Sequence, residues 1–228
     1  MCVDARLVHY NLCSRLAAML TPFRALAGSK RLLALATLTA ISLLGAAPGS
    51  NAQSEIGVLP RGIDQLTNEA HVIVHGYVTS IKIEPHPQLQ NLMTLVVSLN
   101  VKEVYKGRPQ ASLVFRQYVW DLDRSPKALE YRTGDEVVLL LGPVSAYGLS
   151  SPVGLEQGLF RVSRNNQGRL VALNGRRNLG LFDHVAERAR ARGMQLPAPT
   201  GALANQHREG PVLLTDLKDA ILTFARAH

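Results

Sequence analysis

The sequence predicts a mainly β protein in which antiparallel strands form a barrel or a sandwich. Six short segments rich in β-branched, aromatic and apolar residues are separated by turn-forming residues. One of them, residues 93–102, alternates between apolar and largely polar positions, as a strand with one buried face does. Residues 179–228 instead contain good helix formers. Strands that follow one another without intervening helices favour this class over an alternating α/β domain.

Residues 1–52 are predicted to be a signal peptide. An apolar run at 32–47 follows basic residues and precedes a small-residue cleavage site, which is the order found in secretory leaders. The run is shorter than the roughly 20 residues that a membrane-spanning helix needs, so cleavage is favoured over an uncleaved anchor. The mature chain is expected to begin near Gln53, with Met19 as an alternative start of the leader. We therefore expect an exported, periplasmic or extracellular protein without a transmembrane anchor.

Cysteine content and charge restrict the chemistry of the exported chain. Both cysteines, Cys2 and Cys13, lie in the predicted leader, so the mature protein is expected to have no disulfide, thiolate nucleophile or cysteine-bound metal. The formal charge of the whole chain is +8. Without the leader, 20 basic and 16 acidic residues remain, which is a net charge of +4. Because an exported protein meets little nucleic acid, no nucleic-acid partner is expected.

The amino end of the domain is predicted to carry a short helix before the first strand. Residues 53–62 are polar with Gly and Pro, so they form a flexible lead-in to a β domain at 63–178. In residues 63–70 the apolar positions share one helical face. Residues 72–83 are rich in β-branched types and are predicted to be a strand.

Two histidines four residues apart, His71 and His75, raise the question of a metal site. In a strand their side chains would lie roughly 13 Å apart, at about 3.3 Å per residue. That is too far for two imidazoles that must each place a nitrogen about 2.1 Å from one zinc ion. The β-branched residues between them disfavour the helix that would bring them together. The pattern therefore indicates a strand, and Gly76 is predicted to mark a bulge.

The remaining strands are predicted from apolar runs bounded by turns. The polar stretch 121–135 separates the third strand from the fourth, and the turn residues at 165–168 favour a hairpin between the last two. These strands are placed at 93–102, 112–120, 136–142, 159–164 and 169–173.

Residues 179–228 are predicted to be a helical extension. A helix at 182–193 includes the arginine run 188–192, which is interpreted as a solvated face, and a linker rich in Pro, Gly and Ala follows at 195–211. Thr215 is expected to be the N-cap of a C-terminal amphipathic helix. That helix is expected to dock on the sheet through a stripe formed by Leu217, Ile221 and Phe224.

Three stretches in a fixed order, EAHVIVHGYVTSI at 69–81, LNVKEVYKG at 99–107 and GLEQGLFRV at 154–162, resemble a group of uncharacterised exported bacterial proteins. The first two are also similar to netrin-like domains and tissue inhibitors of metalloproteinases, whose core is an OB-like barrel. The resemblance implies an antiparallel OB-like barrel of five to six strands. The zinc-binding cysteine wedge of those inhibitors is not carried over, because no cysteine follows the leader.

The candidate contact face is formed by Arg116, Tyr118 and Trp120. These residues alternate along one predicted strand, so they share a face. In an exported protein, such an aromatic and basic stripe favours a protein, peptide or glycan partner in the cell envelope. Gln157 is a second candidate binding residue, because the glycines beside it allow a tight turn and its amide both donates and accepts hydrogen bonds. The alternative is that Gln157 caps backbone groups of a loop.

A binding or interaction module without enzymatic activity is therefore the favoured function, with no cofactor and no catalytic residue assigned. No G-x-S-x-G or phosphate-binding loop is present. A hydrolase or metal-dependent enzyme using Asp121, Asp123 and one of the two histidines is the alternative, although the two aspartates are only a fragment of a calcium site. An inhibitor of exported proteases is the third possibility.

Overall fold

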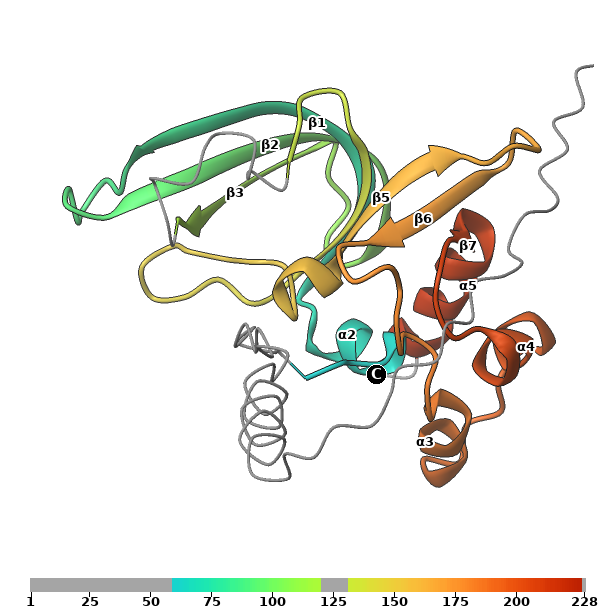
Figure 1. Cartoon of the computed structure of the whole chain (residues 1–228). Coiled ribbons are helices and arrows are strands. Elements are labelled where there is room, and N and C mark those ends of the chain that lie inside the picture. Colours follow the sequence, from blue (N-terminus) through green and yellow to red (C-terminus); the bar gives the residue numbers. More distant parts are fainter. Residues whose placement is uncertain (1–58, 120–130, 227–228) are drawn as a thin grey trace, which may run out of the picture. The chain divides into compact units, whose positions relative to one another are not determined.

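The computed structural model describes residues 59–119 and 131–226 (Figure 1). The predicted leader at 1–52 lies outside the described residues, as do Trp120, Asp121 and Asp123. The described chain is mainly β, as predicted.

One antiparallel sheet has the strand order β3-β2-β1-β4-β5-β6-β7. Six of its strands match the predicted segments, and the seventh, which has two residues, was not predicted. Within the described ranges the ladder ends at β3 and β7 without closing, so the predicted barrel of five to six strands is not confirmed. The strands are β1 (Val72–Pro85), β2 (Met93–Lys106), β3 (Ser112–Tyr118), β4 (Glu136–Leu141), β5 (Leu159–Arg164), β6 (Leu170–Asn174) and β7 (Val212–Leu213).

The helices differ from the prediction in two places. The predicted linker contains α4, which begins directly after Pro197 and has a proline in its first turn, where the missing N–H costs nothing. The C-terminal helix starts at Leu214, so Thr215 lies inside it and the predicted N-cap is wrong. The apolar stripe of that helix is buried, as predicted. The helices are α2 (Ile63–Glu69), η2 (Leu155–Gly158, a 3-10 turn), α3 (Val185–Ala191), α4 (Ala198–Gln206) and α5 (Leu214–Ala225).

Strands β1 and β4 are buried on both faces. On one face, Ile73, Val138 and Leu140 join Phe160 and the helices in a core that we call the helix-side core. On the other face, β1 and β4 contribute to a second core enclosed by the curved β1–β2–β3 meander, the meander core. This explains why the five residues after Glu136 form one continuous apolar run. The meander core contains Val74, Val78, Leu95, Val97, Leu99, Phe115, Val137 and Leu139.

The meander curves because β1 is bulged. The pairing of β1 with β2 changes register between His75 and Gly76, so the predicted bulge is confirmed. A Cβ atom on Gly76 would lie 2.2 Å from the carbonyl oxygen of Asn100, so only glycine permits this approach. The first half of β1 pairs with both β2 and β4, and the second half pairs with β2 alone. The bulge therefore allows β1 to pair with β4 in its first half and to continue into the curved meander in its second half.

Helix α2 is held by ion pairing and by capping from other elements. The Arg188 guanidinium donates to both carboxylate oxygens of Asp64, at 2.8 and 2.6 Å, and Asp64 is buried. The Lys106 ammonium donates to the carbonyls of Thr67 and Asn68 at the other end of the helix. Burial lowers the pKa of Lys106. A seven-residue helix is not stable alone, so these contacts and the core hold it. The interpretation of the arginine run 188–192 as a solvated face is wrong for Arg188, which pairs with a buried carboxylate.

Replacing Gly76 with valine is expected to destabilise the protein by about 3 kcal/mol or more, because the new side chain collides with the β2 backbone. The free energy of unfolding, measured by urea denaturation, tests this. The matched control is Gly201→Ala in α4, where a Cβ meets no atom within 4 Å. That change is expected to be neutral or to stabilise by up to about 1 kcal/mol. Equal unfolding free energies for Gly76→Val and the wild type would contradict the role of the bulge.

Candidate functional site

The side chains of β3 alternate between the meander core and the outside of the sheet. Phe115 is buried in the core, and Gln117 accepts a hydrogen bond from the Tyr131 hydroxyl at 3.3 Å. Val114 and Tyr118 point the other way and are 62% and 38% exposed. We call the side chains of Ser112, Val114, Arg116 and Tyr118 the β3 outer face. Arg116 and Tyr118 share this face as predicted, whereas Trp120 lies outside the described residues.

Arg116 is fixed at the centre of the β3 outer face. Its guanidinium donates to the Thr94 hydroxyl and to the Glu84 carboxylate, both at 2.6 Å. The Thr94 hydroxyl donates to the carbonyl oxygen of Glu84 at 2.8 Å, which joins three strands through side chains. The Arg116 charge is therefore neutralised, and its plane is held in one orientation. Such a residue offers a rigid contact surface and does not act as a free cation.

The described C-terminal helices lie at the other end of the sheet from this face. Figure 1 shows α5 beside β6 and β7 and the helices α4 and α3 farther from the sheet, whereas β3 lies at the opposite edge of the sheet. The loop at 142–154 returns from β4 and reaches β3 through one backbone hydrogen bond, from Ser150 N–H to the Arg116 carbonyl at 2.8 Å. His86 holds the loop: its Nδ1 accepts two backbone N–H bonds from residues 88 and 89, so its Nε2 donates to the Tyr147 carbonyl at 2.7 Å.

Gln157 is buried and binds backbone groups of its own chain. Its Oε1 accepts the Arg61 N–H at 2.8 Å, and its Nε2 donates to the Leu59 carbonyl at 3.2 Å. Both ends of the amide are therefore used to hold the segment before α2. Gln157 therefore caps backbone groups of the segment before α2.

A buried pair of asparagines extends this network. Asn174 and Asn178 each donate a backbone N–H to the side-chain oxygen of the other, at 2.9 and 2.7 Å. The Asn178 amide also donates to the carbonyls of Ala172 and Gly210, which ties β6 to the segment before β7. Asn178 has a left-handed φ of 57°, a conformation that asparagine tolerates better than most residues. The sequence analysis did not identify either residue.

The two histidines of the HVIVH segment have different surroundings. His71 is exposed and precedes β1, whereas His75 is buried and its Nε2 lies 2.9 Å from a carboxylate oxygen of Glu136. Across the sheet, Glu103 pairs with Lys218 of α5 at 2.6 Å. In the described part of the chain, no group of three or more His, Cys, Asp or Glu side chains could hold a metal ion. The pair of Glu103 and Lys218 therefore joins α5 to the sheet.

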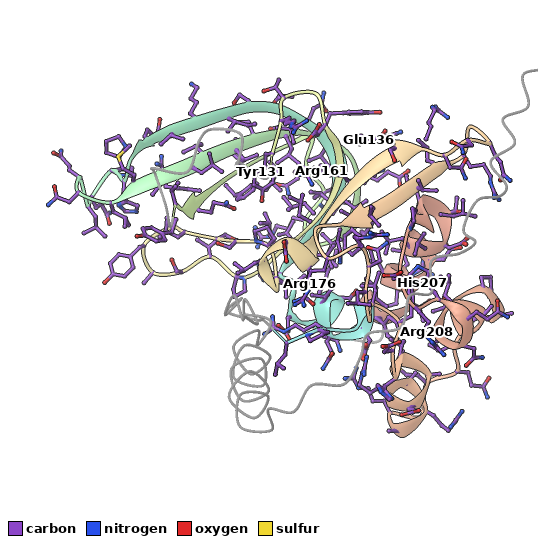
Figure 2. All side chains as sticks on the ribbon, in the orientation of Figure 1. Tyr131, Glu136, Arg161, Arg176, His207 and Arg208 are labelled. Atoms are coloured by element: carbon purple, nitrogen blue, oxygen red, sulfur yellow. The ribbon has the colours of Figure 1, made fainter. Side chains whose placement is uncertain are left out.

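Helices α3 and α4 border a cleft of about 470 Å³. Its charged groups mostly pair with one another: Asp183 lies 3.8 Å from Arg208, and His184 lies 3.0 Å from Glu187. Figure 2 shows His207 and Arg208 among these C-terminal helices, away from β3. The side chains of both pairs are largely exposed, and exposed polar or charged pairs of this kind contribute little to stability.

No protein-family model, no curated protein and no solved structure matches the chain. The resemblance to exported bacterial proteins and to netrin-like domains therefore stays a prediction. Among the described residues, no helix is both long and apolar enough to cross a membrane.

Lys218 controls the ionisation of Glu103. The hydrogen bond from Lys218 lowers the pKa of Glu103 below its usual 4.5, and partial burial opposes this shift. The Lys218→Met variant is expected to raise that pKa, which a carbon-detected NMR titration of the carboxylates would measure. Because the folded pKa is lowered, the pair stabilises the fold above pH 4.5 and its contribution disappears as the pH falls through the folded pKa.

The loss of stability in Lys218→Met is expected to be below about 1 kcal/mol at neutral pH, since the pair is partly exposed, and to vanish in acid. Lys82→Met, at an exposed site on β1, is the matched control and should leave the Glu103 titration unchanged. A Glu103 pKa that is the same in the wild type and in Lys218→Met would contradict this assignment.

Proposed function

We propose that this protein is an exported, non-enzymatic binding module that contacts its partner through the β3 outer face. The observation that carries the proposal is the combination of two partly exposed apolar or aromatic side chains, Val114 and Tyr118, with the fixed guanidinium of Arg116 between them. Tyrosine and arginine are enriched at the residues that dominate binding energy. Because Arg116 is already held, little side-chain entropy is lost when a partner binds.

The proposed partner is a protein, peptide or glycan of the cell envelope. An aromatic ring beside a neutralised guanidinium can pack against an apolar side chain, a peptide group or a sugar ring. Single-stranded nucleic acid needs a positively charged groove, and at this face Glu84 neutralises Arg116. Export, which the predicted leader supports, is part of the proposal.

We also propose that the meander belongs to an OB-like barrel in which the 142–154 loop takes the place of a closing strand. The hydrogen bond from Ser150 to Arg116 supports this arrangement, since it joins the loop to the edge of β3. The bridge between Leu141 and Pro152 supports it from the other side, because it joins the same loop to β4.

A hydrolytic or metal-dependent activity is the second candidate. The 2.9 Å contact between His75 and Glu136 favours it, because a carboxylate that orients an imidazole recurs in acid–base catalysis. His75 is 2% exposed, however, so a substrate would reach it only if the residues around it moved. Elemental analysis of the purified mature protein separates the two functions: a stoichiometric metal would favour the enzyme.

The Tyr118→Ala variant is expected to weaken retention on immobilised envelope extract by roughly 5- to 30-fold, the effect of removing one important interface aromatic. Retention is measured as the fraction bound across a range of protein concentrations. Tyr147→Ala is the matched control, since Tyr147 is an exposed tyrosine on the 142–154 loop. The proposal predicts wild-type retention for the control. Equal retention of Tyr118→Ala and wild type, both with unchanged unfolding midpoints, would remove this face from consideration.

A further inference from the structure

Among residues 59–119 and 131–226, none bonds to the outward backbone groups of Ser112 and Val114 at the edge of β3. We propose that this edge receives an extended peptide segment of the partner, which pairs with β3 as an additional strand. The inference rests on the proposed function and names its partner class and its mode of binding. Extended peptides bind exposed sheet edges in this way, with main-chain hydrogen bonds providing much of the affinity.

The direction of the backbone groups follows from the pairing with β2. Val101 donates its N–H to the Ala111 carbonyl at 2.9 Å, and Val119 donates to the Met93 carbonyl at 3.4 Å. In an antiparallel ladder, alternate residues point their N–H and C=O groups toward the same neighbour. The odd-numbered residues of β3 therefore bond to β2. The N–H and C=O groups of Ser112, Val114 and Arg116 point to the open side.

The 142–154 loop bonds to one of these outward backbone groups and not to the others. Ser150 bonds to the Arg116 carbonyl, so another backbone segment can approach this edge within hydrogen-bonding distance. Two residues before Ser150, the Gly148 N–H is taken by the Ser145 carbonyl at 2.9 Å, and two residues after it, Pro152 has no N–H. The loop therefore stops after one bond. Within the described ranges, no residue bonds to the outward backbone groups of Ser112 and Val114.

In the described part of the chain, residues 112–114 also lack the features that usually block strand addition. Natural edge strands are protected by charged side chains, proline or bulges. Residues 112–114 are Ser, Leu and Val, their pairing with β2 is regular, and the nearby Arg116 is neutralised by Glu84. A partner backbone can therefore approach without burying an unpaired charge. Because Val114 is 62% exposed on the outer face, the peptide is expected to place an apolar side chain beside it.

In the test, a displayed library of random heptapeptides is selected on the wild-type protein. The enriched peptides are then synthesised, and their affinity for the wild type and for the variants is measured. Val114→Pro removes only an outward N–H, so the ladder with β2 is kept, and proline is tolerated at such edge positions. Val114→Ala shortens the side chain and keeps the N–H. We expect Val114→Pro to weaken binding by at least roughly tenfold and Val114→Ala by less than about threefold. If Val114→Pro lowers the unfolding midpoint, Ser112→Pro at the first strand residue replaces it.

Each of the following outcomes would contradict strand addition by a peptide. If the selected peptides bind Val114→Pro as well as wild type but lose affinity for Tyr118→Ala, the β3 outer face binds peptides without using the edge, and the proposed function stands. If neither variant matters, or no peptide is enriched, both the inference and a peptide-binding function at this face fail. If the wild type self-associates in sedimentation velocity and Val114→Pro does not, the occupant of the edge is a second copy of the chain.

Discussion

The structure depends on the burial of strands β1 and β4 on both faces. The helix-side core and the meander core meet at this pair of strands, and together they contain most of the large buried side chains. A strand that is packed on both faces cannot shift its register without moving apolar residues into the wrong core. The bulge at Gly76 allows β1 to leave the helices and continue into the curved meander. Val114 and Tyr118 on the β3 outer face belong to neither core and stay partly exposed.

Side-chain amides bind irregular segments whose backbone groups are not paired within a helix or the sheet. Gln157 holds the chain before α2, its own carbonyl accepts a bond from Asn174, and Asn178 reaches the segment before β7. These amides satisfy backbone groups of irregular segments that would otherwise be buried without partners. The same principle governs His86, which fixes the 142–154 loop. The 142–154 loop is thus held at Tyr147 by His86 and at Ser150 by the Arg116 carbonyl.

Local pattern was sufficient to predict the strands but not their partners. The β-branched run after His71 and the alternation at 93–102 identified β1 and β2, and Gly76 identified the bulge, because these signals lie in neighbouring residues. Helix α4 was missed because its Pro and Gly content is typical of linkers, whereas tertiary packing stabilises it. The common face of Arg116 and Tyr118 followed from period two. The contacts of Arg116 with Glu84 and of His75 with Glu136 did not, since they depend on which strands become neighbours.

Strand β3 thus combines a rigid outer face with an edge whose backbone groups are only partly used. The most direct test of this claim is residue-resolved amide hydrogen exchange along β3, measured by NMR on the free protein. We expect the Phe115 and Gln117 amides, which bond to β2, to be strongly protected and the Val114 amide to exchange at close to the unprotected rate. Protection of Val114 equal to that of Phe115 would show that the edge is covered, and would contradict the assignment of β3 as the binding strand.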